Sequence, residues 1–482
     1  MIDLRPIVYV IGLVTAILGA TMLVPMLVDL YFGSPDWMVF LSTATITMVV
    51  GGSLALATFN TARQGLTIQQ TFLLTTLIWI ALPVFAALPF ALGALGARPV
   101  DAMFEAMSGL TTTGSTVLQG LDDLPKGLLL WRSMLQWFGG VGIIVVAMAF
   151  LPELRVGGMQ IFRSEGFDTL GKVLPRAVDI AGRITLIYVA LTAINTLAYL
   201  AVGMGPFDAV NHAFTTIATG GSSTHDASFG AFSGAPEYVA SLFMILGSLP
   251  FVRYIQMVQG SARPLFTDPQ VRAFFGLTAV VVLAMTLFRI FDSTGPLEQA
   301  FRESLFNVTS ILSGTGYAST DYQLWGPFPV VVFFFLGLVG GCAGSAACSV
   351  KIFRYQLLFA AVRAQIRAIH LPHGVFTPRY NGRPVTEDIL SSVMAFFGMF
   401  VVSLGVLSVA LGMTGLDTIT AVSGAATALA NVGPGFGPII GPSGNFESLN
   451  DTAKWLLTAA MLVGRLEVLS VYVLFTLRFW RD

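Results

Sequence analysis

Four short segments of this sequence carry a glycine in a similar setting, and together they could offer backbone carbonyl oxygens to a cation. The segments read FEAMSGLTTTGST, VNHAFTTIATGGS, FNVTSILSGTGYA and SGAATALANVGPG. They align on Gly114, Gly220, Gly316 and Gly433. Small β-branched residues stand just before these glycines, namely Thr112, Thr113, Thr219, Thr315 and Val432. We therefore consider an ion site that is built from the backbone.

A ring of carbonyl oxygens suits potassium. An ion that enters a narrow pore must shed its water, and carbonyls aimed at one axis can replace that water. Glycine allows the backbone angles that this requires and that a Cβ atom would oppose. Any one of these glycines is also compatible with an ordinary tight turn. Four of them in one register favour a K⁺ selectivity filter formed by the glycines and their β-branched neighbours.

The residues before each glycine predict the element that positions it. About ten small, apolar or hydroxyl residues make roughly three helical turns, whereas a bilayer span needs about 20 residues. Irregular backbone at membrane depth is tolerated only where protein buries it or where it lines a water-filled cavity. We expect four re-entrant half-helices from the outer side, with their negative dipole ends at the filter.

The composition places these segments in a membrane. Of 482 residues, 55% are hydrophobic and 11% charged, and the mean hydropathy is +0.79, whereas soluble domains carry about 25% charged residues. Apolar runs of spanning length begin near residues 7, 37, 70, 128, 181, 237, 272, 328, 389 and 455. The sequence thus predicts an all-α membrane protein with ten transmembrane helices. Its partner is the lipid bilayer, and no basic stretch suggests nucleic acid.

The spans and half-helices predict four tandem repeats of span, pore helix and span around one central pore. Residues 1–63 form two additional N-terminal transmembrane helices. The repeats cover residues 64–155, 180–262, 270–370 and 385–482, and the second span of the third repeat is interrupted.

Basic residues predict the orientation. Of the 25 lysines and arginines, only six fall on the outer side if the N-terminus is cytoplasmic; these are Arg98, Lys126, Arg132, Arg289, Arg302 and Lys454. All the others except Arg465, which lies within a span, then fall on the inner side. The positive-inside rule therefore predicts that both termini are cytoplasmic.

Two further features lie within predicted spans. Gly340, Gly341 and Gly344 would break a helix, and broken spans carry moving or coordinating backbone in transport proteins; the alternative is that small residues allow close helix packing. Arg465 is costly in mid-span unless it faces a cavity or finds a partner. It either faces the pore and opposes cations or forms a buried structural ion pair.

Several motifs together resemble the bacterial Trk/Ktr/HKT superfamily, and most closely its TrkH-type potassium-uptake subunits. They are SGLTTTGSTV, QWFGGVGIIVVAMAFLP at 136–152, GGCAGSAACSVK at 340–351 and MLVGRLEVL at 461–469. The resemblance covers essentially the whole chain. It implies K⁺ uptake through the bacterial inner membrane, with Gly114, Gly220, Gly316 and Gly433 as the filter glycines.

The resemblance also implies a gate and partners. Residues 340–351, including Ser345 and Lys351, match an intramembrane loop that gates the pore, and Arg465 matches an arginine that projects into the pore below the filter. The implied partners are a TrkA-like cytosolic ring of nucleotide-binding domains and a second copy of the chain in a homodimer. Two departures are Cys348 and Ser349, where glycines usually precede the lysine. Val432 and Pro434 argue against strict fourfold symmetry.

Other readings have less support. Cys342 and Cys348 are expected to be free thiols, two histidines at 370 and 373 are too few for a metal site, and Ser222 with His225 lacks the acid of a hydrolase triad. We expect no enzyme activity and no cofactor beyond the transported K⁺. The competing function is a secondary transporter that couples K⁺ to H⁺ or Na⁺, although only Arg465 and Glu467 are ionisable in mid-span.

Overall fold

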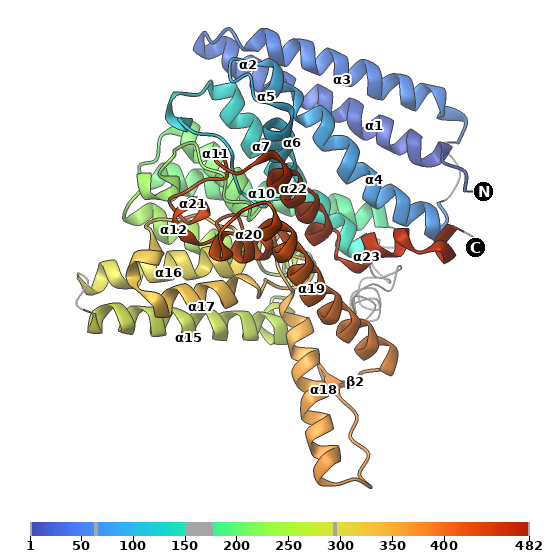
Figure 1. Ribbon diagram of the computed structural model, residues 1–482, viewed down its shortest axis with the longest axis vertical. Coiled ribbons are helices and arrows are strands. Elements are labelled where there is room, and N and C mark those ends of the chain that lie inside the picture. Colours follow the sequence, from blue (N-terminus) through green and yellow to red (C-terminus); the bar gives the residue numbers. More distant parts are fainter. Residues whose placement is uncertain (1, 62–65, 150–176, 293–295, 481–482) are drawn as a thin grey trace.

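The computed structural model describes residues 2–61, 66–149, 177–292 and 296–480 of the chain, which are predominantly helical (Figure 1). Among these residues the one sheet is a small antiparallel hairpin of β1 (Arg379–Tyr380) and β2 (Arg383–Pro384). The all-α architecture that the sequence predicts is thus confirmed for the described residues. Six of the basic residues predicted to be on the inner side lie outside the described residues: Arg63, Arg155, Arg163, Lys172, Arg176 and Arg481.

Two helical segments lie within residues 1–63, before the predicted start of the first repeat. The first consists of α1 (Arg5–Thr21) and α2 (Leu23–Phe32), and the second is α3 (Trp37–Ala57). Two glycines allow α1 and α3 to pack closely, because a Cβ atom on Gly51 would lie 2.6 Å from the carbonyl oxygen of Gly12. These helices form one flank of the molecule in Figure 1.

Each of the four predicted repeats contains apolar helices and a shorter helix at the position of the predicted pore helix. The first contains α4 (Ile68–Ala86), α5 (Leu88–Leu92), α6 (Pro99–Leu110) and α7 (Lys126–Ala149). The second contains α10 (Ala177–Ala201), α11 (Pro206–Ile217), α12 (Ala235–Gly247) and α13 (Phe251–Val258), and α14 (Arg263–Thr267) lies between the second and third repeats. The third contains α15 (Pro269–Phe291), α16 (Leu297–Ser313), α17 (Pro327–Gly337) and α18 (Ile352–His370). The fourth contains α19 (Glu387–Met413), α20 (Thr418–Ala430), α21 (Gly437–Ile440), α22 (Asp451–Arg465) and α23 (Leu469–Tyr472).

The pore helices are α6, α11, α16 and α20. Three of them have 12 or 13 residues, close to the predicted three turns, whereas α16 has 17 residues. Proline at the first turn starts α6 and α11, where its missing N–H costs no hydrogen bond. Asp417 starts α20 as an N-cap, since its carboxylate accepts from Thr420 N at 3.1 Å.

Seven helical segments of the described chain are long and apolar enough to cross a membrane, and two bent pairs bring the number to nine. The bent pairs are α12 with α13, at 91°, and α22 with α23, at 102°. The sequence predicts one span at each of these places. The helices bend there because Pro250 starts α13 and because Glu467 adopts a left-handed φ of 58° after α22. The remaining predicted span, from residue 328, stays a prediction, because α17 has only 11 residues.

The third repeat is interrupted between Gly337 and Ile352. Helical structure stops at the end of α17 and resumes at α18, which agrees with the helix break expected from the glycines in this stretch. A single parallel bridge between Val339 and Val350 brings the two ends of the intervening segment together. We call residues 338–351 the inner loop.

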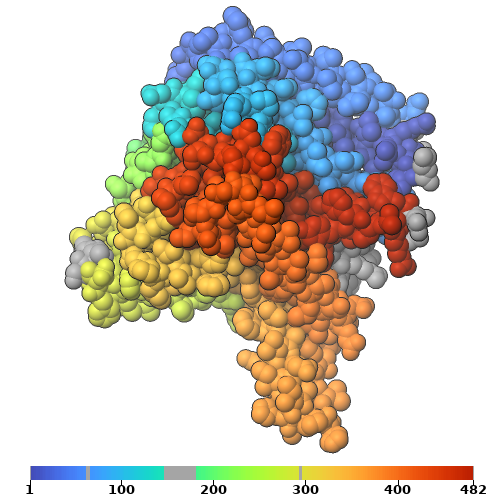
Figure 2. Space-filling model, in the orientation of Figure 1, coloured from blue at the N-terminus to red at the C-terminus, as the bar shows by residue number. Residues whose placement is uncertain are grey.

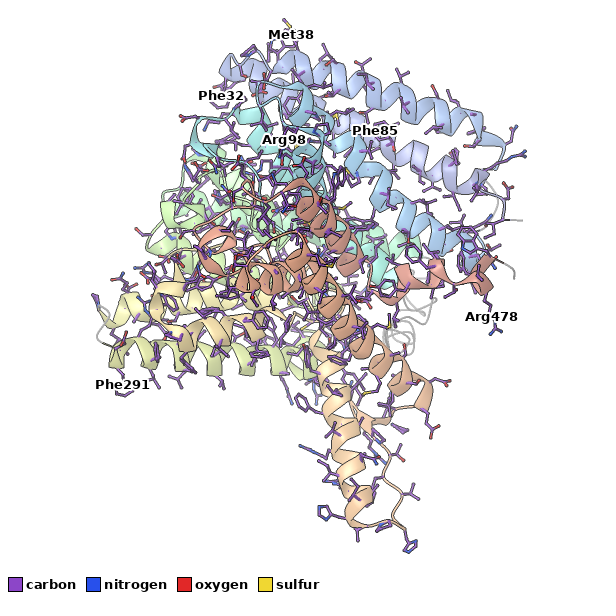
Figure 3. The ribbon with its side chains drawn as sticks, in the orientation of Figure 1. Phe32, Met38, Phe85, Arg98, Phe291 and Arg478 are labelled. Carbon is purple, nitrogen blue, oxygen red and sulfur yellow. The ribbon has the colours of Figure 1, made fainter. Side chains whose placement is uncertain are left out.

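Large apolar side chains face outward around the helices. Met38 on α3 and Phe291 at the end of α15 are 61% and 84% exposed, and both lie at the periphery in Figure 3. Exposed apolar surface of this extent is typical of a protein that is surrounded by lipid. The exception to the rounded outline is an arm made of α18 and the β1–β2 hairpin, which extends away from the other helices (Figures 1 and 2).

Candidate ion-conduction site

The four pore helices end in the same hydrogen-bonded turn, which defines the register of the repeats. In each case a backbone N–H donates to the carbonyl oxygen five residues earlier. The pairs are Thr113 to Ser108 at 2.9 Å, Gly220 to Thr215 at 2.9 Å, Thr315 to Ser310 at 2.8 Å, and Val432 to Thr427 at 3.1 Å. Thr113, Gly220, Thr315 and Val432 are therefore structurally equivalent positions.

Backbone angles support the same register and correct the sequence alignment in the second repeat. The residue before each equivalent position has a left-handed φ: Thr112 (52°), Thr219 (51°), Gly314 (76°) and Asn431 (53°). The residue after it is a glycine with positive φ: Gly114 (82°), Gly221 (74°), Gly316 (82°) and Gly433 (95°). The glycine that corresponds to Gly114 is thus Gly221. The sequence offers two adjacent glycines there, and the turn at Thr219 selects the second.

The four glycines and their neighbours form a closed ring. A Cβ atom added to Gly114 would collide with the carbonyl oxygen of Gly220, and one on Gly221 would collide with that of Thr315. One on Gly316 would collide with the carbonyl oxygen of Val432.

The fourth contact closes the circle. A Cβ atom on Gly433 would lie 2.9 Å from the carbonyl oxygen of Thr113, which belongs to the first repeat. Each glycine therefore lies against a carbonyl of the next repeat. Only a residue without a Cβ atom allows this approach.

Polar side chains on the pore helices hydrogen-bond to the segment that follows each ring glycine. Glu105 on α6 accepts from Val117 N at 3.2 Å and from Thr116 Oγ1 at 3.0 Å. Asn307, at the equivalent position of α16, accepts from Ser319 N at 3.2 Å. In the other two repeats His212 contacts Ser223 Oγ at 3.0 Å, and Ser423 Oγ accepts from Phe436 N at 2.9 Å. In each repeat, a polar side chain of the pore helix thus fixes the segment that follows the ring.

Two residues of α7 connect the first repeat to the second. Arg132 forms a buried ion pair with Glu105 at 2.7 Å and donates to the carbonyl oxygen of Ser223 at 3.0 Å. Gln136 donates to the carbonyl oxygen of Gly220 at 2.7 Å, and its own oxygen accepts from Ser222 N at 3.0 Å. A buried charge that is paired and hydrogen-bonded in this way is costly to disturb. The sequence analysis missed both residues, although a charge and an amide in an apolar helix are signals of such a role.

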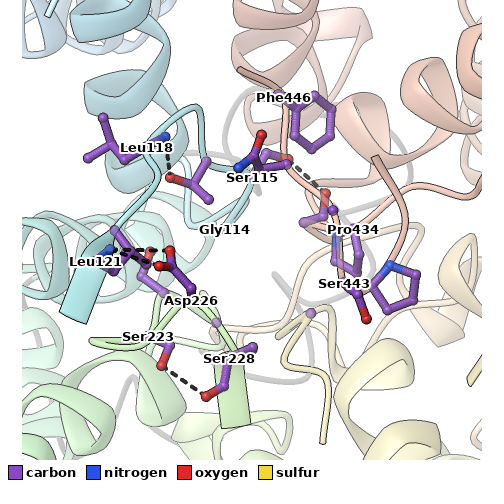
Figure 4. Close-up of a pocket in the computed structure, with 18 of the residues that line it drawn as sticks. Gly114, Ser115, Leu118, Leu121, Ser223, Asp226, Ser228, Pro434, Ser443 and Phe446 are labelled. Carbon is purple, nitrogen blue, oxygen red and sulfur yellow. Dashed lines mark hydrogen bonds between the residues drawn. The ribbon is translucent and has the colours of Figure 1, made fainter. Parts of the chain in front are cut away.

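A vestibule of about 320 Å³ lies on one side of the ring and is lined by Gly114, Gly316, Gly433 and the loops that follow them (Figure 4). Asp226 and Ser223 lie at its margin, where Asp226 accepts from Leu121 N at 3.2 Å. His225 hydrogen-bonds Asp122 across two loops, and this bond lowers the pKa of the Asp122 carboxyl. The lining therefore contains the Asp226 carboxylate and several hydroxyl groups, whose oxygens suit a cation, together with Arg132, whose charge is paired with Glu105.

The inner loop contacts the ring from another side. Cys348 Sγ lies 3.3 Å from Thr112 Oγ1, and Ser349 N donates at 2.8 Å to the carbonyl oxygen of Ala430, the last residue of α20. Cys342 and Cys348 are free and buried. The loop thus reaches the first and fourth repeats at the level where their pore helices end.

The predicted gate residues anchor this loop. Gly340 N donates to the carbonyl oxygen of Val350 at 2.9 Å, the oxygen of Gly341 accepts from Ile352 N at 3.2 Å, and the oxygen of Gly344 accepts from Phe251 N at 3.0 Å. Ser345 Oγ donates to the carbonyl oxygen of Cys342 at 2.6 Å. Lys351 Nζ donates to the carbonyl oxygen of Ala347. A Cβ atom on Gly340 would collide with the oxygen of Cys348, so the loop requires a glycine there.

Arg465 lies against the inner loop. Its Nη1 is 2.9 Å from Cys348 Sγ, its Nη2 is 3.4 Å from the carbonyl oxygen of Gly139, and the side chain is 5% exposed. Among the described residues it forms no ion pair, because Glu467 pairs with Arg354. The buried-pair interpretation of Arg465 therefore has no support here. A cavity of about 40 Å³ is lined by Arg465, Cys348 and Lys351, among others.

Comparisons with known proteins identify similar sequences and a similar fold. The family model TrkH, described as a cation transport protein, matches residues 37–481. The chain is 44% identical to the Trk system potassium uptake protein TrkI of Halomonas elongata, over 99% of this chain and 97% of that protein. It is 36% identical to the Trk system potassium uptake protein TrkH of Escherichia coli K12, over 99% of both. The crystal structure of the potassium transporter TrkH from Vibrio parahaemolyticus superimposes with a TM-score of 0.91, at 33% identity and full coverage of both chains.

Proposed function

The chain belongs to the TrkH family of cation transport proteins, and on this basis we propose that it takes up potassium ions across a bacterial inner membrane. It is a multi-pass transport protein and not an enzyme. The relatives that match nearly its whole length are potassium uptake proteins.

The selectivity filter in this proposal is the closed ring. It comprises Thr112, Thr113, Gly114, Thr219, Gly220, Gly221, Thr315, Gly316, Val432 and Gly433. The single observation that carries it is the cyclic order of contacts, in which each glycine meets a carbonyl of the next repeat. Carbonyl oxygens from four repeats around one axis can replace the hydration shell of K⁺.

The gate in this proposal is the inner loop. Its glycines and Ser345 hold it in place, and its Cys348 contacts Thr112 of the ring. Arg465 and Lys351 add positive charge there, which opposes a cation. Movement of the loop away from Ala430 and Thr112 would open a path.

We further propose that the arm and the neighbouring cytoplasmic loops contact a TrkA-like partner, a cytosolic ring of nucleotide-binding domains. We also propose that two copies of the chain form a homodimer. The arm carries the basic residues Arg363, Arg367, Arg379 and Arg383, which the positive-inside rule assigns to the cytoplasm together with both termini. A partner that controls the inner loop would then act through α18, which follows it directly.

The decisive experiment measures reversal potentials in proteoliposomes under separate K⁺, Na⁺ and H⁺ gradients. A channel-like filter predicts that the reversal potential follows the K⁺ gradient alone. A shift with the H⁺ or Na⁺ gradient would instead support coupled transport, the competing function. Protein-free liposomes provide the control, and no K⁺-dependent potential in vesicles with folded protein would contradict the proposed function.

A further inference from the structure

An apolar crevice of about 260 Å³ opens between α1, α4 and α7, and the last residue of α6 forms part of its wall. Trp79 and Leu110 are buried in it, whereas Ile17 is 55% exposed, so the crevice opens outward. Its one hydroxyl, on Thr21, already donates to the carbonyl oxygen of Leu18 at 2.7 Å. Apart from this hydroxyl and the indole N–H of Trp79, the lining is apolar.

The crevice lies at the level of membrane hydrocarbon. Except for Leu110, its lining residues come from three candidate spans, Arg5–Phe32, Ile68–Leu92 and Lys126–Val145. A surface that faces the bilayer at that depth meets lipid acyl chains. A second helix is about 10 Å wide, too wide for a crevice of this volume.

Two glycines of α7 shape the crevice. Gly139 is required by packing, because a Cβ atom there would collide with the carbonyl oxygen of Leu110. Gly142 is not, because a Cβ atom there would meet nothing within 4 Å. The space beside Gly142 is therefore open to an apolar occupant, and leaving it empty would forfeit dispersion contacts along the whole lining.

We propose that this crevice binds one lipid acyl chain. The bound acyl chain would lie behind the ring, because Leu110 ends α6 two residues before Thr112. It would also touch Gly139, whose carbonyl oxygen accepts from Arg465 Nη2. The acyl chain thus supports, from the membrane side, the same backbone that holds the ring and Arg465.

Trp79 provides a direct readout that does not depend on transport. In proteoliposomes of phosphatidylcholine with brominated acyl chains, bromine should quench Trp79, whose contribution is the difference from the Trp79→Phe variant. Gly142→Leu fills the crevice and should reduce the quenching of Trp79 at least twofold. Gly276→Leu on α15 is the matched control, because a Cβ atom there also meets nothing within 4 Å, and it should leave the quenching unchanged.

Equal quenching of Trp79 in the wild type and in Gly142→Leu would overturn the proposal. If Gly142→Leu does not fold, a lipid with a photoactivatable acyl chain decides the question on the wild-type protein. Adducts within residues 78–82 and 138–142 support a bound chain, and adducts confined to exposed positions such as Ile17 overturn it. Potassium flux in the same vesicles tests the proposed function separately, since the quenching pattern does not require conduction.

Discussion

Neutralising Arg465 should raise the maximal potassium flux. The guanidinium stays positive at any working pH. Its Nη1 lies 2.9 Å from Cys348 Sγ, which in turn lies 3.3 Å from Thr112 Oγ1. These contacts put the charge within about 6 Å of the filter, where it repels a potassium ion by roughly 3 kcal/mol at an effective dielectric constant of 20. Pore water reduces this value.

A barrier of half that size corresponds to about a tenfold change in rate. Arg465→Ala should therefore raise the maximal K⁺ flux by about tenfold and leave K⁺/Na⁺ selectivity nearly unchanged, because the ring itself is intact. Arg465→Gln removes the charge but keeps most of the volume, and it should behave like Arg465→Ala. Arg465→Lys keeps the charge and should be much milder.

The assay is K⁺ flux per folded molecule in proteoliposomes, with thermal stability measured for each variant. Arg354→Ala is the matched control, because this neighbouring arginine is also buried but has a carboxylate partner in Glu467. Its loss should destabilise the protein by roughly 3–5 kcal/mol. If Arg465→Ala is destabilised to the same degree and gains no flux per molecule, the charge-barrier reasoning is refuted.

Gly114→Ser should weaken K⁺/Na⁺ discrimination because any Cβ atom there collides with a ring carbonyl; unchanged permeability ratios would exclude this glycine from the filter. Gly221→Ala should impair selectivity more than Gly220→Ala, since only Gly221 has the positive φ that costs alanine about 1–2 kcal/mol, and the reverse order would favour the sequence register. Shortening residues 343–347 should raise basal flux and reduce its dependence on the cytosolic partner, as flux with and without that partner would reveal. Glu105→Ala should lower the free energy of unfolding by roughly 3–5 kcal/mol because its buried arginine loses its partner, and a thermal melt close to wild type would contradict this.

Apolar run length and local pattern predict most of the fold. The four pore helices and the break near Gly340 follow from short helical segments and from glycines, which are local features. The second-repeat register does not follow, because Gly220 and Gly221 are adjacent and only the turn at Thr219 decides between them. The bends after Gly247 and Arg465 were also missed, since hydropathy continues across them.

Side-chain partners are less predictable than elements, because they depend on long-range contacts. Glu467 is two residues from Arg465 in the sequence, yet it pairs with Arg354 of the third repeat. Cys348, which departs from the family pattern, is the residue that contacts both Arg465 and Thr112. Neither contact could be derived from spacing within one helix.

Biogenesis of this protein must end with closure of the ring. The contact between Gly433 and Thr113 joins the last repeat to the first, and Ser115 Oγ donates to the carbonyl oxygen of Gly433 at 2.7 Å. Lys454, which is fully buried, reaches Asp101 across the same seam at 2.6 Å. During synthesis the first pore helix therefore lacks its contacts with Gly433 and Lys454 until the fourth repeat has entered the membrane. Such long-range closure is slow compared with the formation of each helix.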